Sequence, residues 1–146
     1  ALPHEKLAQL LELSTVIFAN ETETAFLCEE FGLKEIRDLF QNEKLQILVE
    51  TLGAEGSRVY YRDGGQICQT QARAVRPLCA EPETVGAGDG YVCGFLYGLV
   101  HGRSVHECAL LGGTLSSFVL EKEGSITTLP TEAQLLARYE TIRRDD

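Results

Sequence analysis

The sequence predicts an α/β fold, a three-layer αβα sandwich with a mostly parallel sheet, in one domain over residues 1–146. Two observations predict it. Short unbroken apolar runs at residues 15–19 and 45–49 have the pattern of strands buried on both faces of a parallel sheet. Segments with helical periodicity stand between and after these runs. A chain of 146 residues is long enough to bury a hydrophobic core as a single domain.

The first half of the chain alternates helices and strands. Residues 2–13 place leucines on one face and polar residues on the other, which predicts an amphipathic helix that begins near Pro3. Asn20 ends the first strand. The other elements expected in this half are helices over residues 21–30 and 33–40 and the strand at 45–49.

The second half begins with a hairpin. Residues 57–62 and 66–70 flank Asp63-Gly64-Gly65, which has strong turn chemistry. Thr131 is a suitable N-cap for a closing helix. The remaining expected elements are a strand near residues 72–77, helices over 87–101 and 104–121, a short strand at 125–129 and the closing helix at 131–142.

Charge and hydropathy exclude several classes of partner. The formal net charge is -9, with 22 acidic and 13 basic residues and no basic cluster, which argues against nucleic acid and anionic membranes. The longest apolar runs are far shorter than the ~20 residues of a membrane span. The polar start of the chain lacks the hydrophobic region of a signal peptide.

The five cysteines indicate a reducing environment. Their number is odd and no Cys-x-x-Cys pair occurs, so free thiols in the cytoplasm are expected rather than disulfides. The three histidines are scattered, and no zinc-type cluster is expected. The simplest interpretation of the cysteines is that they are small buried hydrophobic residues.

A glycine-rich turn, Gly86-Ala87-Gly88, runs directly into an apolar helical segment with Asp89 at the junction. The first amides of a helix lack intrahelical acceptors and lie at the positive end of its dipole, so they favour an anion. Glycines let that backbone approach a phosphate closely. The amides could hold charge on a transferring group while Asp89 takes a proton from an attacking hydroxyl. The structural alternative is a turn whose aspartate only complements the helix dipole.

These residues, followed by Gly94-Phe95-Leu96, resemble the signature of the ribokinase-like (PfkB) carbohydrate kinases, which include ribokinase, fructokinase and adenosine kinase. Two upstream motifs match in the family's order: Asn20-x-x-Glu23 and Thr51-x-Gly53-x-x-Gly56. The resemblance covers residues 10–130 but only the C-terminal half of the family, with some preference for adenosine-kinase-like members. It implies the C-terminal portion of a ribokinase-like fold, whose N-terminal half, carrying most of the acceptor site, is an expected partner.

The resemblance also implies site residues, with ATP and Mg²⁺ as cofactors. Asp89 would be the catalytic base, and Gly86, Ala87 and Gly88 would supply the anion-binding amides. Asn20 and Glu23 would order magnesium through water, although Asn followed three residues later by Glu is also a helix capping box. The nucleotide would contact Asn20, Thr51, Leu52, Gly53, Gly56, Gly88 and Gly113, while the structural alternative for residues 51–56 is a strand-to-hairpin turn.

Four positions depart from the family's pattern, and two of them are mild changes: Gly90 and Tyr91 replace the common Ala and Phe. Glu83 stands where the family usually has Asp, in a segment that often helps to bind a monovalent cation, so activation by such a cation is left open. Gly113 falls where some relatives place a side chain against adenine. That contact would then be lost or made by the backbone.

The function expected from these features is transfer of the γ-phosphoryl group of ATP to a hydroxyl of a small-molecule sugar or nucleoside. The 146 residues alone are expected to be inactive and poorly soluble. Two alternatives stay open: a non-catalytic nucleotide-binding or interaction module of this family, and an unrelated α/β domain whose glycines only pack helices. Glycines recur every four residues from Gly86 to Gly102, and close helix packing is predicted for Gly94 and Gly98. A homodimer also stays open.

Overall fold

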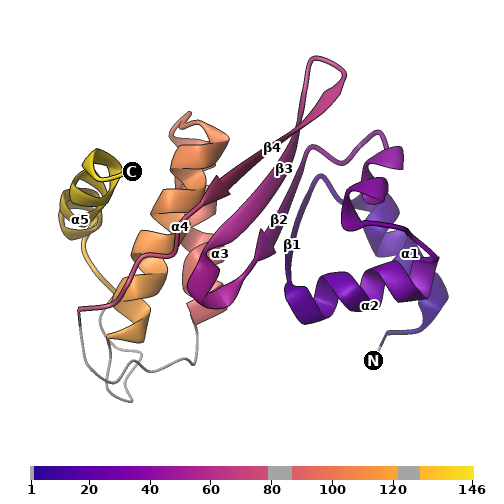
Figure 1. The fold of residues 1–146 in the computed structure, drawn as a ribbon, viewed down its shortest axis with the longest axis horizontal. Coiled ribbons are helices and arrows are strands. Elements are labelled where there is room, and N and C mark those ends of the chain that lie inside the picture. The colour runs from indigo at the N-terminus through magenta and orange to yellow at the C-terminus, as the bar shows by residue number, and fades with distance from the viewer. Residues whose placement is uncertain (1, 79–86, 122–128) are drawn as a thin grey trace. The chain divides into compact units, whose positions relative to one another are not determined.

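The computed structural model describes residues 2–78, 87–121 and 129–146. Its contacts divide the chain into two compact units. The sheet unit comprises Ala1–Gly53 and Ser57–Gln71, and the helical unit comprises Ala54–Gly56 and Ala72–Asp146 (Figure 1). Within the three described ranges, no helix has the length and apolar character needed to cross a membrane.

The sheet unit contains four strands in the order β1-β2-β3-β4, with bounds Val16–Asn20, Ile47–Thr51, Ser57–Asp63 and Gln66–Ala72 (Figure 1). Strand β1 pairs with β2 in parallel, and β2 pairs with β3 antiparallel. The turn between β3 and β4 uses Gly64 and Gly65 at φ 55° and 88°, the positive values that a tight two-residue hairpin turn requires. The predicted hairpin is therefore confirmed.

Helices α1 (His4–Leu13) and α2 (Glu21–Phe31) agree with the sequence prediction. Gly32 ends α2 in the left-handed conformation, with φ 62°. The helix expected over residues 33–40 is instead a 3₁₀ helix, η1, at Ile36–Gln41. It begins late because the Asp38 carboxylate accepts hydrogen bonds from the backbone N–H groups of Lys34 and Glu35, which caps the turn there.

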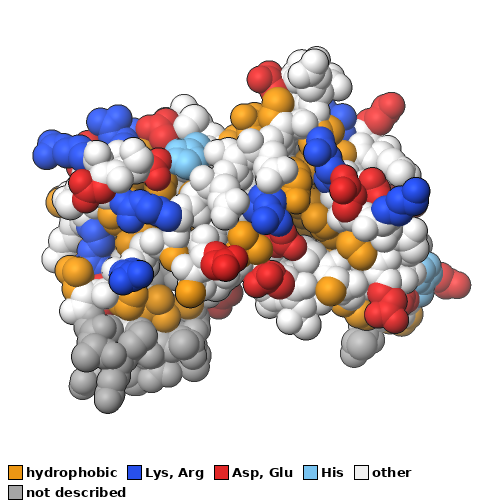
Figure 2. Space-filling model, viewed as in Figure 1, with side chains coloured by type: hydrophobic (Ala, Val, Ile, Leu, Met, Phe, Trp, Pro, Cys, Tyr) orange, Lys and Arg blue, Asp and Glu red, His pale blue; other side chains and the backbone are white. Residues whose placement is uncertain are grey.

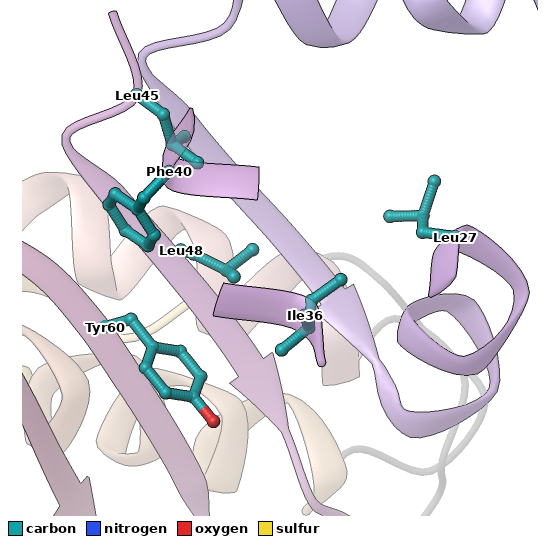
Figure 3. Packing of buried hydrophobic residues seen from close by; sticks show 6 residues of the cluster. All are labelled: Leu27, Ile36, Phe40, Leu45, Leu48 and Tyr60. Carbon is teal, nitrogen blue, oxygen red and sulfur yellow. The ribbon is translucent and has the colours of Figure 1, made fainter. Parts of the chain in front are cut away.

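The core of the sheet unit lies between the sheet and these helices. Leu48 and Tyr60 are opposite each other on β2 and β3 and therefore share one face of the sheet. Residues from α2, η1 and the approach to β2 complete the cluster shown in Figure 3, namely Leu27, Ile36, Phe40 and Leu45. On the other face, Val49 and Val59 are fully buried. Strand β2 is thus buried on both faces, as its apolar run predicts.

The helical unit contains α3 (Ala87–Val100), α4 (Val105–Leu120) and α5 (Glu132–Arg144) (Figure 1). Helices α3 and α4 are in very close contact. A Cβ atom placed on Gly94 would lie 2.4 Å from the carbonyl oxygen of Leu111, and one on Gly98 would lie 2.7 Å from Cys108 Sγ. These glycines therefore pack helices, as their spacing predicts.

A half-buried carboxylate ties α4 to α5. Glu107 Oε2 accepts hydrogen bonds from the Tyr139 hydroxyl at 3.0 Å and from Arg103 Nη1 at 3.3 Å. The backbone N–H of Ser104 and these side-chain donors lower the pKa of Glu107 to about 2 against the opposing effect of burial. Burial and the neighbouring Glu107 carboxylate raise the pKa of Tyr139 to about 12.

The two remaining predicted strands, at residues 72–77 and 125–129, have different outcomes. The strand at residues 72–77 is wrong, because regular structure ends with β4 at Ala72. The Arg73 guanidinium donates to the Ile142 carbonyl at 3.0 Å, and Pro77 has no N–H to donate to a sheet. The strand at 125–129 falls outside the described residues, apart from Leu129. The Thr131 cap on α5 is confirmed by a hydrogen bond from the Gln134 N–H.

Candidate active site

Asn20 is the last residue of β1 and the N-cap of α2. Its Oδ1 accepts the Glu23 N–H at 2.8 Å, and Glu23 Oε1 accepts the Asn20 N–H at 2.9 Å. The capping-box alternative is therefore present in the structure. It uses only one carboxylate oxygen of the exposed Glu23, and no described residue is recorded as a partner of Oε2. Capping and an ordering role toward hydrated magnesium are compatible.

Thr51 ends β2 directly opposite Asn20 in the parallel pair. The carboxyl ends of parallel strands are where α/β sheets bind ligands, so the pairing brings two of the three motifs to one edge. Leu52 is buried, and a short 3₁₀ turn, η2 (Gly53–Glu55), follows. Gly53 has φ 59°.

Gly56 must be a glycine. Its φ is 95°, and a Cβ there would lie 2.0 Å from the Ala72 carbonyl oxygen. The loop consequently lies against the backbone of residues 72–74. Gly113, on α4, faces the next residue of the same segment: its Cβ would lie 3.0 Å from Val75 Cγ2. Within the helical unit, residues 72–75 therefore contact two of the predicted nucleotide-binding glycines.

A groove of about 730 Å³ in the helical unit adjoins these residues. Ala54 and Glu55 of η2, the segment 73–76 and one side of α5 line it. The groove contains both acidic and basic residues. Arg73 Nε lies 3.9 Å from Asp146 Oδ1, whereas Arg76 forms no ion pair with any of the described residues. On the face shown in Figure 2, basic and acidic side chains are likewise interspersed.

The start of α3 carries the predicted catalytic residues. Gly86 lies outside the described residues, while Ala87, Gly88 and Asp89 form the first turn of the helix. Gly88 and Asp89 are exposed, and no described atom would lie within 4 Å of a Cβ on Gly88. The first-turn amides therefore stand beside a carboxylate that has no hydrogen-bond or ion-pair partner among the described residues, at the positive end of the α3 dipole. Such an arrangement can bind an anion beside a proton acceptor.

The described residues form no group of three or more His, Cys, Asp or Glu side chains able to hold a metal ion directly. This does not conflict with magnesium held through water, which needs only one or two carboxylates. Cys28, Cys68, Cys93 and Cys108 are free thiols, and burial raises the pKa of Cys108 to about 11.

Sequence reasoning missed one polar cluster near this edge. Glu50, immediately before Thr51, is buried and contacts both Thr24 of α2 and Arg58 of β3. The one sequence feature that indicates this cluster is that a glutamate directly follows the apolar run at residues 45–49. Its partners, 26 and 8 residues away, cannot be read from the sequence spacing.

The fold is α/β, with two of the predicted motifs at one edge of the sheet and the third at the start of α3. Comparison with known proteins then shows the family: the sequence profile of the pfkB family of carbohydrate kinases matches residues 1–132. The chain belongs to this family, as the motifs predicted.

Among curated relatives, the chain is 32% identical to a nucleoside kinase of Methanocaldococcus jannaschii over 141 residues, which are 95% of this chain and 43% of the relative. It is 35% identical to a 5-dehydro-2-deoxygluconokinase of Bacillus cereus over 100 residues, covering 66% of this chain and 27% of that one. The chain thus spans less than half the length of these relatives and matches their C-terminal portion.

Solved structures confirm the ribokinase-like α/β fold. The M. jannaschii nucleoside kinase, an archaeal member of the ribokinase family, matches with a TM-score of 0.83 at 29% identity, covering 96% of this chain and 44% of that one. A nucleoside kinase of Burkholderia thailandensis in complex with ADP-inosine matches with a TM-score of 0.83 at 28% identity, covering 97% and 42%.

Proposed function

We propose that this chain is the C-terminal, nucleotide-binding and catalytic portion of a kinase that transfers the γ-phosphoryl group of ATP to a hydroxyl of a nucleoside or sugar. One observation carries the proposal. In a chain of the pfkB family, Asn20 and Thr51 end adjacent parallel strands as direct register partners, so that the two upstream motifs share one sheet edge.

Asp89 is the proposed general base. The acceptor hydroxyl oxygen would attack the γ-phosphorus, the bond to the β-phosphate bridging oxygen would break, and ADP would leave. Asp89 would take the hydroxyl proton, and the amides of Gly86, Ala87 and Gly88 would hold the charge on the transferring group. Two observations support this role: Asp89 is exposed, and no atom of the described residues would lie within 4 Å of a Cβ on Gly88.

Asn20 and Glu23 are the proposed residues for magnesium, which would neutralise charge on the ATP phosphates. The Oε2 atom of Glu23, which has no hydrogen-bond partner among the described residues, supports contact through water. Thr51, Leu52, Gly53 and Gly56, with Gly88 and Gly113, would line the nucleotide. The close approach of Val75 to Gly113 supports a backbone rather than side-chain contact at that position. Monovalent-cation activation remains open, because Glu83 lies outside the described residues.

A nucleoside is the preferred acceptor. The nucleoside kinases match 94–97% of this chain at 28–32% identity, and one of them was solved with inosine. A sugar is the second candidate, because the 5-dehydro-2-deoxygluconokinases share 35% identity over a shorter range. The acceptor site itself would lie mostly in an N-terminal half of the same fold, in a cytoplasmic protein. A non-catalytic nucleotide-binding module is the alternative function.

Turnover by the full-length protein tests the proposal. Purified protein is assayed for ADP formation with Mg-ATP against inosine, adenosine, ribose and fructose, with the Asp89→Asn variant as control. We expect a nucleoside to be phosphorylated by the wild type and far more slowly by the variant. Stabilisation of the fold by Mg-ADP without turnover on any acceptor would favour the non-catalytic alternative.

A further inference from the structure

The cluster around Glu50 lies directly beneath the first turn of α2. Ala19, Glu50 and Arg58 are aligned across β1, β2 and β3, two residues beyond Ile17, Leu48 and Tyr60. Because side chains alternate along a strand, Glu50 and Arg58 point to the same face as the core in Figure 3. Helix α2 contributes Leu27 to that core, and Thr24 is one turn closer to its N-terminus.

Both oxygens of the Glu50 carboxylate are used. Thr24 Oγ1 lies 2.6 Å from Oε2, and Arg58 Nη1 donates to Oε1 at 3.0 Å. Thr24 is 4% exposed and Glu50 is 8% exposed. Hydrogen bonds to a buried charged group are short and require a particular geometry. Removing one partner leaves the other buried and unpaired, which lowers the free energy of unfolding. The contact therefore fixes the rotation and height of the first turn of α2 above β2.

That turn carries Asn20 and Glu23. Residue Glu23 immediately precedes Thr24, and Asn20 is bound to Glu23 through the reciprocal cap. Glu50 in turn immediately precedes Thr51, the register partner of Asn20. The buried Glu50 carboxylate therefore connects two parts of the proposed site. One is the first turn of α2, with the proposed magnesium residues, and the other is the end of β2, with Thr51.

We infer that Glu50 is a positioning residue: acting through Thr24, with Arg58 holding its carboxylate, it keeps the first turn of α2, and with it Asn20 and Glu23, in the geometry needed to order magnesium. This inference rests on the proposed function for its metal part. Outer partners of this kind orient metal-binding groups, and their loss typically lowers metal affinity about 10–100-fold.

The test uses the full-length protein with the substitution Thr24→Val, which preserves shape and removes the hydroxyl. Thr24→Ser, which retains the hydroxyl, is the rescue variant. Glu107→Gln is the matched control, because Glu107 is also a carboxylate held by an arginine and a hydroxyl, but in the helical unit. Two readouts are measured: hydrogen exchange of the amides in residues 20–27, and the magnesium concentration that gives half-maximal stabilisation by ADP and half-maximal turnover.

We expect Thr24→Val to accelerate exchange in residues 20–27 and to raise the magnesium requirement about tenfold, with Thr24→Ser near the wild type. Glu107→Gln should lower the melting temperature and leave both readouts unchanged. Unchanged exchange in Thr24→Val, or faster exchange at an unchanged magnesium requirement, overturns the inference. A wild type without Mg-dependent nucleotide binding or turnover overturns the proposed function instead. Faster exchange in Thr24→Val then still supports the positioning of α2 by the Thr24 hydroxyl, which lies 2.6 Å from Glu50 Oε2 and 3.0 Å from the Glu21 carbonyl oxygen.

Discussion

Asn20 and Thr51 lie directly opposite each other at the carboxyl ends of the parallel strands β1 and β2. The two residues are 31 positions apart in the sequence, yet the strand register makes them neighbours. A shift of one residue in this register would send one of the two side chains to the opposite face of the sheet. The relative position of the two motifs is thus a property of strand pairing.

Asp89→Asn should abolish most of the activity of the full-length enzyme. The substitution preserves shape and removes the proton acceptor at the exposed start of α3. We expect kcat to fall about 10²–10⁴-fold with a modest change in ATP affinity. Steady-state kinetics on the preferred acceptor check this. A near-normal kcat would exclude Asp89 as the base.

Glu23→Gln should separate capping from magnesium ordering. Glutamine retains the Oε1 acceptor for the Asn20 N–H and loses the carboxylate charge. We expect a higher magnesium requirement in turnover assays with little change in melting temperature. A clear loss of stability at an unchanged magnesium requirement would assign Glu23 to the cap alone.

Two glycines of α3 should respond in opposite ways to alanine. Gly94→Ala places a methyl group 2.4 Å from the Leu111 carbonyl, so we expect a loss of about 1–3 kcal/mol in the free energy of unfolding. Gly88→Ala meets no described atom and should leave stability unchanged or slightly higher, while it reduces ATP turnover. Denaturant titrations and kinetics check both variants, and equal destabilisation would contradict the distinction.

The ionised Glu107 carboxylate should increase the free energy of unfolding at neutral pH and lose this effect in acid. Its pKa falls from 4.5 to about 2 on folding, so its contribution is fully present above about pH 4.5 and disappears as the pH falls toward 2. Glu107→Gln should cost about 1–3 kcal/mol at pH 7. It should also flatten the loss of stability between pH 4.5 and pH 2. Denaturant titrations across this range test the sign, and parallel curves for the two proteins would contradict it.

The 146 residues alone should not phosphorylate an acceptor. The chain covers 43% of the M. jannaschii relative, and β1 is the end strand of the described sheet. An end strand with the apolar sequence Val16-Ile17-Phe18 favours association with other chains. We expect poor solubility and no turnover, both restored by a longer product of the same gene. A monomeric, cooperatively unfolding 146-residue protein with kinase activity would contradict this.

Local chemistry explains what the sequence could predict. Helix ends at Asn20, Ser104 and Thr131 carry their own caps, and Gly64-Gly65 determines its turn, so these elements were predictable within a few residues. Strand β2 lies two residues further along than its apolar run, because pairing rather than hydropathy sets its ends.

The parts that could not be predicted depend on distant partners. The irregular segment after Ala72 is held by the close approach of Gly56 and by the hydrogen bond from Arg73 to the Ile142 carbonyl. The Thr24–Glu50–Arg58 cluster joins three elements whose contact follows only from the folded register. The site residues were identified by their resemblance to a family.

The glycine face of α3 has a mechanical consequence. Gly90, Gly94 and Gly98 bring this helix so close to α4 that methyl groups at any of the three would meet atoms within 3 Å. Each residue of a helix advances about 100° around its axis, so a turn of α3 by one residue would replace these glycines with side chains that do not fit. Helix α3 can therefore pack against α4 in only one rotational orientation. The close contacts along the turns that follow Asp89 thus determine the direction in which the Asp89 side chain points.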